Sequence, residues 1–341
     1  MKLTDLKWED KISNPSQMGG IETYVIDNGP GRGTRIAWIN TGSGFRYKVV
    51  IDRGLDIADA FYNQYNLSWI SHLGITPPQP FSAKGIDWLR TFGGGLLTTC
   101  GLSHVGGPES DEFGERGLHG HISNIPAELV NISQPDPLTG KLDFSITGIM
   151  RETKPFGPSL ELHRTISGTL GSPMLRIQDK VINRGNTPAP HMLLNHFNFG
   201  WPLIDVGTDL KWEGDWTTRN GDRNGIIFKE GNSFKKAPAP LPSHNGSGEE
   251  VAFIDVVHNN GKSSCGLFNP HLQFGVTIRF NKSELPWLTN WQHWGKNEYV
   301  TGLEPGTHPP IGQAAARANG TLIEIQPGES RSYDLQVEID R

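Results

Sequence analysis

The sequence predicts an all-β fold, a large antiparallel β-sandwich with very little helix. Short runs rich in β-branched and aromatic residues recur along the chain, and 42 glycines and 24 prolines separate them. Apolar residues spaced three and four positions apart, the pattern of an amphipathic helix, are nearly absent. Many short strands joined by turn-rich segments are typical of large sandwiches.

Pairs of strands are predicted where two such runs flank a turn. Residues 34–51, TRIAWINTGSGFRYKVVI, predict a hairpin whose loop is formed by residues 41–44. The same composition recurs in residues 160–185 and in residues 321–339. We therefore expect strand pairs at all three places.

Outside the strands, the sequence predicts two short helices and two loops. Residues 311–320, IGQAAARANG, predict one short helix that ends at its glycine, and residues 3–12 predict another. Residues 104–117 and 218–250 lack a sustained apolar period. We expect these two segments to be loops that run over the surface.

Composition limits the domain organisation and the partners. All-β chains of this length can form one continuous sandwich, so we expect residues 1–341 to be a single domain with an extension at about residues 1–16. We expect neither a secretory signal nor a membrane span. The net charge of −5 and the absence of a basic run disfavour nucleic acid as a partner. A small neutral or polar molecule is the expected ligand.

Cysteine content indicates the compartment. The two cysteines, Cys100 and Cys265, are far apart in sequence and lie among apolar residues. This usage fits a reducing environment in which both thiols stay free. We therefore expect a cytoplasmic protein with no disulfide.

The run LLNHFNFGWP, residues 193–202, places a histidine among large apolar residues. In a strand, alternation puts His196 and Asn198 on one face and Asn195 and Phe197 on the other. Burying an imidazole without a partner costs roughly 1–3 kcal/mol. His196 is therefore either a hydrogen-bonded core residue or part of a site.

A second candidate is the run RGLHGHISNIPAE, in which His119 and His121 lie two residues apart. If the segment is extended, the two imidazoles share a face, and such a pair can bind a metal together with a third histidine and a carboxylate. The flanking glycines also permit a tight turn in which only one imidazole points inward. The spacing alone leaves both possibilities open.

Two charged residues stand at predicted strand ends. Glu304 precedes Pro305 and Gly306, where a strand is expected to open into a turn at the sheet rim. Arg53 follows an apolar strand and is flanked by acidic residues, so it forms either a local ion pair or a fork for substrate hydroxyls. Either residue has a purely structural explanation when it is taken alone.

Taken together, these motifs resemble those of the galactose mutarotases. NHFNFG, residues 195–200, is similar to the histidine strand of that family, and GLEPGT, residues 302–307, is similar to its Leu-Glu-Pro strand end. LHGH, residues 118–121, and Arg53 match in the same order. The runs DRGLDI, GGLLTTCGL and GLHGHISN resemble an uncharacterised branch of aldose 1-epimerase family proteins.

The resemblance implies a fold, a reaction and roles for residues. It implies the mutarotase-type sandwich and interconversion of sugar anomers by ring opening, without a cofactor or metal. Glu304 would be the base and His196 the acid. Arg53 and His119 would bind the sugar, with His121 and Asn198 beside them. Trp291 and Trp294 would be walls for the apolar face of the sugar, although both are equally typical of core aromatic residues.

Two other classes of function remain open at this stage. One is a metal-dependent sugar isomerase, epimerase or lyase whose ligands are His119, His121, His196 and Glu304, which elemental analysis would identify. The other is a sugar-binding protein without turnover, which would bind a ligand without accelerating anomer exchange.

Overall fold

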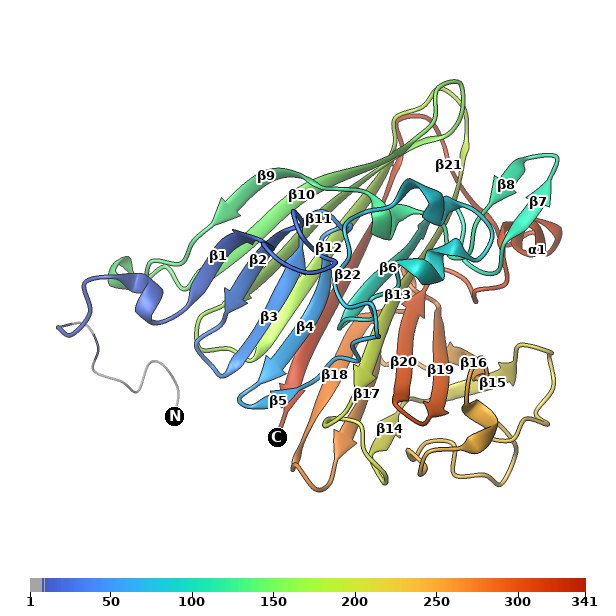
Figure 1. Cartoon of the computed structure of the whole chain (residues 1–341). Helices are drawn as coiled ribbons and strands as arrows, with labels where there is room; N and C mark the ends of the chain where they lie inside the picture. The colour runs from blue at the N-terminus through green and yellow to red at the C-terminus, as the bar shows by residue number, and fades with distance from the viewer. Residues whose placement is uncertain (1–7, 9) are drawn as a thin grey trace.

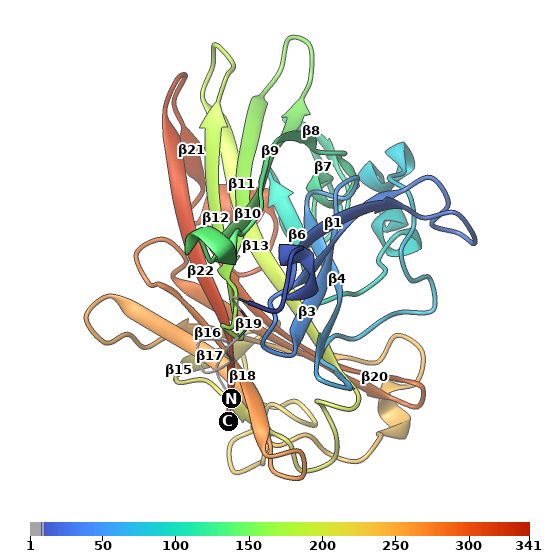
Figure 2. The ribbon, with the colours of Figure 1, turned by 90° about the vertical axis from the view of Figure 1, so that its left-hand side faces the viewer.

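The computed structural model describes Trp8 and residues 10–341. Two large antiparallel sheets pack as layers around a shared core (Figures 1 and 2). Within the described residues there is one α-helix, α1 (Gln313–Ala318). The prediction of an antiparallel β-sandwich with very little helix is confirmed.

The larger sheet has 12 strands and contains the predicted histidine strand near its middle. Its strands, in spatial order, are β1 (Gly20–Val25), β2 (Arg35–Asn40), β3 (Phe45–Val50), β4 (Asp56–Tyr62), β6 (Leu97–Leu102), β13 (Ala189–Gly200), β20 (Glu298–Gly306), β19 (Trp287–Gly295), β16 (Glu250–Val256) and β15 (Gly214–Thr218). Two short strands lie off this path: β5 (Tyr65–Asn66) pairs with β4, and β21 (Ile323–Ile325) pairs with β13.

The second sheet has eight strands and covers one face of the first. In spatial order they are β14 (Asp209–Lys211), β17 (Lys262–Asn269), β18 (Phe274–Asn281), β22 (Ser330–Asp340), β12 (Met174–Asn183), β11 (Ser159–Thr169), β10 (Asp143–Thr153) and β9 (Glu128–Ser133). A small hairpin joins β7 (Glu109–Asp111) to β8 (Gly114–Arg116). Single 3₁₀ turns are η2 (Pro15–Gln17), η3 (Pro80–Ala83), η4 (Asp87–Arg90), η5 (Ile122–Asn124), η6 (Pro137–Thr139) and η7 (Pro242–His244).

Alternation along β13 separates two apolar clusters. The odd-numbered Leu193 and Phe197 belong to the main core between the sheets. The even-numbered Met192 and Leu194 belong to a second cluster, which includes Trp88. This second cluster lies on the face of the larger sheet that is turned away from the smaller one, and it forms the surroundings of the candidate site.

A buried arginine connects the two sheets. Arg164 of β11 is fully buried and makes a two-pronged ion pair with Asp179 of β12, with distances of 2.8 and 2.7 Å. Its Nη1 also donates to Oδ1 of Asp56 on β4, at 3.2 Å, and to Oγ1 of Thr99 on β6, at 2.7 Å. The same guanidinium therefore pairs with both carboxylates.

The strand predictions are confirmed except at the C-terminal end. Residues 34–51 contain the paired strands β2 and β3, and residues 160–185 contain the paired strands β11 and β12. The expectation for residues 321–339 was wrong in its pairing: β21 pairs with β13, whereas β22 pairs with β12 and β18. The chain crosses between layers at this turn, so two successive strands join different sheets.

The other local predictions have mixed outcomes. The helix predicted within residues 311–320 is α1, and both cysteines are free. Residues 104–117 contain the β7–β8 hairpin, so that segment is not purely a loop. The helix predicted at residues 3–12 lies mostly outside the described residues. No helix in the described part of the chain is long and apolar enough to cross a membrane.

Candidate active site

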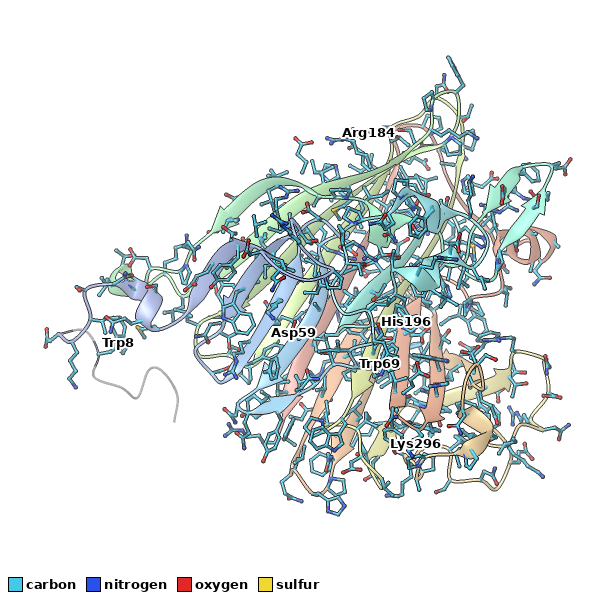
Figure 3. The ribbon with its side chains drawn as sticks, viewed as in Figure 1. Trp8, Asp59, Trp69, Arg184, His196 and Lys296 are labelled. Atoms are coloured by element: carbon cyan, nitrogen blue, oxygen red, sulfur yellow. The ribbon has the colours of Figure 1, made fainter. Side chains whose placement is uncertain are left out.

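Two adjacent strands of the larger sheet place His196 opposite Glu304. β13 and β20 are antiparallel, and the register that pairs Phe197 with Leu303 also sets His196 opposite Glu304. Nε2 of His196 lies 3.3 Å from Oε1 of Glu304. The carboxylate of Glu304 extends over Gly302, where any side chain would collide with it. An imidazole and a carboxylate, distant in sequence, therefore meet near the middle of the sheet. Figure 3 labels His196 there.

This pair is buried, whereas the sequence had led us to expect Glu304 at the rim of the sheet. His196 is 6% exposed and Glu304 is 2% exposed. Among the described residues, neither Nδ1 of His196 nor Oε1 of Glu304 has a hydrogen-bond partner. Burial lowers the pKa of His196 to about 4 and raises the pKa of Glu304 well above its usual range. The low-polarity surroundings thus favour the neutral form of each group.

Asn198 lies on the same face of β13 as His196, as strand alternation predicted. Its Nδ2 donates to the carbonyl oxygen of Gly95 at 3.1 Å and to that of His196 at 2.9 Å. Its Oδ1 is buried without a hydrogen-bond partner in the described part of the chain. Asn198 therefore adds an acceptor oxygen beside the pair.

His119 approaches the pair from a turn. Its φ of 56° is left-handed, and Gly120 follows with a φ of 73°. The His119 ring lies 6.1 Å from that of His196 and 5.0 Å from that of Trp88, measured between ring centroids. Burial lowers the pKa of His119 to about 3, and its Nδ1 has no partner within the described residues. A fourth unpartnered polar group thus joins the cluster.

Aromatic rings enclose His196. Phe92 lies 5.4 Å and Trp291 5.5 Å from the His196 ring, and Trp69 lies 6.2 Å from Trp291. Trp88, on η4, stacks on Phe92 at 4.4 Å. These apolar surroundings produce the burial that shifts both pKa values. Trp291 is therefore close enough to the pair to be a wall of the site.

Trp294, the other predicted wall, does not lie with Trp291. It is three residues further along β19, so alternation turns it to the opposite face. It is fully buried in the main core, where its Nε1 donates to Gln292 at 2.9 Å. For Trp294 the core interpretation was the right one.

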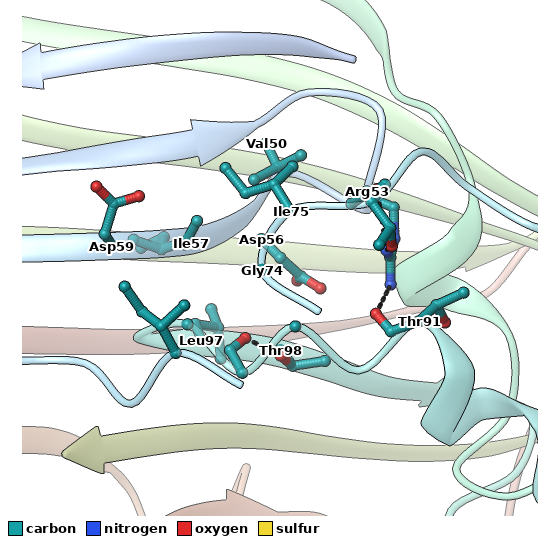
Figure 4. Close-up of a pocket in the computed structure, with 16 residues that line it drawn as sticks. Val50, Arg53, Asp56, Ile57, Asp59, Gly74, Ile75, Thr91, Leu97 and Thr98 are labelled. Carbon is teal, nitrogen blue, oxygen red and sulfur yellow. Dashed lines mark hydrogen bonds between the residues drawn. The ribbon is translucent and has the colours of Figure 1, made fainter. Parts of the chain in front are cut away.

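Arg53 lies in an adjoining pocket (Figure 4). Its Nη1 donates to Oγ1 of Thr76 at 2.8 Å, and its Nη2 donates to the carbonyl oxygen of Thr91 at 3.0 Å. Its Nε donates to the carbonyl oxygen of Ser123. Burial lowers its pKa to about 10. Backbone and Thr76 oxygens hold the guanidinium at the edge of a pocket that also includes Thr98, the residue opposite His196 on β6. The guanidinium does not form the local ion pair considered as the alternative. A role for Arg53 in binding sugar hydroxyls stays a prediction.

His121 does not share the orientation of His119. The segment is a turn followed by η5 rather than an extended strand, and His121 stands at the start of η5. Its Nδ1 lies 3.0 Å from Oγ of Ser82. The four ligands of the predicted metal alternative are therefore not gathered. In the part of the chain that the structure describes, no three His, Cys, Asp or Glu side chains form a group that could hold a metal ion.

Comparison with known sequences places the chain in a family. Residues 31–339 match a family described as a domain of unknown function (DUF4432). The chain belongs to the DUF4432 family. No curated protein matches this DUF4432 chain.

Solved structures show the fold that the DUF4432 protein shares. A proposed aldose 1-epimerase from Klebsiella pneumoniae subsp. pneumoniae has a TM-score of 0.84 and 22% identity, covering 94% of this chain and 83% of that one. A galactose mutarotase-like protein from Clostridium acetobutylicum has a TM-score of 0.67 and 14% identity, covering 95% and 99%. Galactose 1-epimerase from Lactobacillus acidophilus NCFM has a TM-score of 0.60 and 13% identity, covering 94% and 98%. The predicted resemblance to an uncharacterised mutarotase-like branch is confirmed.

Sequence reasoning missed two residues of the DUF4432 protein that border the pair. Residues 218–250 were predicted to be a surface loop, yet Arg219 and Glu249 from this segment form an ion pair of 2.7 Å beside Trp291. Both charges influence the pKa of Glu304. The sequence does not indicate either residue, because a polar residue in a glycine-rich segment is typical of any solvated loop.

Proposed function

We propose that this DUF4432 protein is a sugar isomerase of the aldose 1-epimerase type, which interconverts the anomers of an aldose or aldose derivative. The observation that carries the proposal is the buried His196–Glu304 pair, 3.3 Å apart, with a ring nitrogen and a carboxylate oxygen that have no partner among the described residues. Perturbed titratable groups enclosed by aromatic rings are typical of catalytic sites. The fold shared with proteins described as galactose mutarotase-like supports the same class.

Anomer exchange requires one base and one acid. The base removes the proton from the anomeric hydroxyl while the acid protonates the ring oxygen; the ring opens, the aldehyde rotates, and the steps reverse. We propose that the pair holds one proton, which either partner can carry. With this proton on His196, Glu304 accepts the hydroxyl proton and His196 protonates the ring oxygen.

Three neighbours would position the sugar. The face of Trp291 is suited to the apolar face of a pyranose, because aromatic rings bury C–H surface without needing a polar partner. Nδ1 of His119 and Oδ1 of Asn198 are buried and lack hydrogen-bond partners within the described residues. We propose these two groups as hydroxyl ligands.

The proposal predicts a bell-shaped dependence of kcat/KM on pH. Below about pH 4, the value to which burial lowers the pKa of His196, both groups are protonated and no base remains. Above the raised pKa of Glu304, the pair has lost its shared proton and no acid remains. Initial rates of exchange measured from acid to alkaline pH test this prediction. A flat profile across that range would be incompatible with one shared proton.

A screen of sugars tests the function itself. Anomer exchange of aldoses, uronates, deoxy sugars and sulfonated sugars is followed by NMR with increasing amounts of the wild-type protein. We expect at least one class to exchange at a rate proportional to the protein concentration. Binding of a sugar without any acceleration would instead identify a carbohydrate-binding protein without turnover.

A further inference from the structure

Glu249 connects three strands at the edge of the candidate site. It lies immediately before β16, and its two carboxylate oxygens have different partners. Oε2 accepts a hydrogen bond from Nε1 of Trp291 on β19 at 2.7 Å. Oε1 accepts one from Nη2 of Arg219, the residue after β15, at 2.7 Å. The two ends of the segment that joins β15 to β16 are therefore bound to each other, and Glu249 binds the segment to Trp291.

The bond to Trp291 determines which way that ring faces. Trp291 pairs with Gly302 across the β19–β20 ladder, two residues from Glu304. Its ring centroid lies 5.5 Å from that of His196, at an interplanar angle of 69°. An indole has a single hydrogen-bond donor, so an acceptor placed at Nε1 selects one orientation of the ring. Glu249 thereby fixes the ring that encloses His196.

The same ion pair places two opposite charges near Glu304. Burial is the main reason that the pKa of Glu304 is raised; the carboxylate of Glu249 raises it further, and the guanidinium of Arg219 lowers it. Among the described residues, the titratable groups close to this carboxyl include His196 on β13 and Cys100 on β6. Arg219 also lowers the pKa of His119, after burial and the two neighbouring histidines.

We propose that Glu249 is a positioning residue of the His196–Glu304 site: it orients Trp291 against His196 and, together with Arg219, sets the charge around Glu304. This inference rests on the proposed isomerase function. It gives the segment between β15 and β16 a role in the reaction. It also predicts opposite effects for the charges of Glu249 and Arg219, which can be tested separately.

Three variants separate orientation from charge. Glu249→Gln keeps an acceptor oxygen for the indole and removes the negative charge, whereas Glu249→Ala removes both. Arg219→Gln removes the positive charge and keeps the bond between Glu249 and Trp291. Glu230→Gln is the matched control, because Glu230 lies in the same segment, is exposed, and pairs with Arg223 instead.

The orientation is read from the Trp291 indole N–H signal in a ¹⁵N–¹H correlation spectrum, assigned with Trp291→Phe. We expect this signal to shift in Glu249→Ala and to stay near its wild-type position in Glu249→Gln. We also expect kcat/KM to fall by about tenfold or more in Glu249→Ala, since small misplacements at a reacting centre are costly, with partial recovery in Glu249→Gln.

The effect of the two charges on Glu304 is measured from the pH profile of kcat/KM. Removing a negative charge favours deprotonation of Glu304, so Glu249→Gln is expected to move the profile to lower pH. Removing the positive charge has the opposite effect, so Arg219→Gln is expected to move it to higher pH. The Glu230→Gln profile should coincide with that of the wild type.

Failure of this inference is distinguishable from failure of the function. An active wild type whose indole signal and pH profile are both unchanged by Glu249→Ala would overturn the role of Glu249, and shifts of the same sign in both charge variants would overturn the electrostatic part. A wild type that accelerates no sugar would overturn the function. In that case, the indole signal and a ¹³C titration of the Glu304 carboxyl in the same variants would still support or overturn the positioning.

Discussion

Replacing Glu304 by Gln, or His196 by Ala, is expected to lower the rate of anomer exchange by roughly 10²–10⁴-fold, the usual contribution of a general acid or base. The two side chains are 3.3 Å apart and share one proposed proton, so loss of either leaves no complete route for it. Steady-state kinetics on the best substrate from the sugar screen measures the effect. The loss should appear in kcat as well as in kcat/KM, because the interaction acts in the transition state.

His258→Ala is a suitable control for these variants, since His258 is an exposed histidine remote from β13 and β20 in the sequence. Its activity should equal that of the wild type. A Glu304→Gln variant with wild-type kcat, confirmed as folded by circular dichroism, would show that the chemistry belongs to other residues.

Replacing Arg164 by Met is expected to lower the free energy of unfolding by about 3–5 kcal/mol, the range found when one partner of a buried ion pair is removed. The variant would leave Asp179 without its two-pronged partner and Asp56 without its only arginine hydrogen bond among the described residues. Both carboxylates are buried between the sheets. Urea unfolding followed by tryptophan fluorescence measures the difference.

Arg176→Met provides the comparison, because Arg176 pairs with Asp334 at a largely solvated position where its side chain is 42% exposed. That substitution should change the free energy of unfolding by at most about 1 kcal/mol. Equal losses in the two variants would indicate that burial of the Arg164 network contributes nothing special to stability.

Much of the fold was predictable because strand signals are local. The hairpin at residues 34–51 follows from two β-branched runs and a glycine-rich turn, and the structure contains it as β2 and β3. The partners of β21 and β22 were not predictable in the same way. The turn between them is visible in the sequence, but the change of layer depends on strands more than 100 residues away.

Residues of the candidate site were predictable where they belong to a recognisable sequence motif. His196 and Asn198 share a face because β13 alternates, and the match of GLEPGT to a known strand end identified Glu304. Contacts between segments that are far apart in the chain correspond to no such motif. Whether Arg53 faces His196 or the oxygens of Thr76 depends on how three loops pack, and the charge of Glu249 acquires significance only through its contact with Trp291.

Exchange NMR on an aldose labelled with ¹³C at the anomeric carbon tests the central claim most directly. Equal amounts of wild type and of the His196→Ala/Glu304→Gln double variant are compared on the best substrate. We predict cross-peaks between the α and β signals with the wild type, their reduction to the uncatalysed level in the double variant, and a double variant little worse than the worse single variant. Cross-peaks of wild-type intensity in the double variant would contradict the proposal that this pair performs the chemistry.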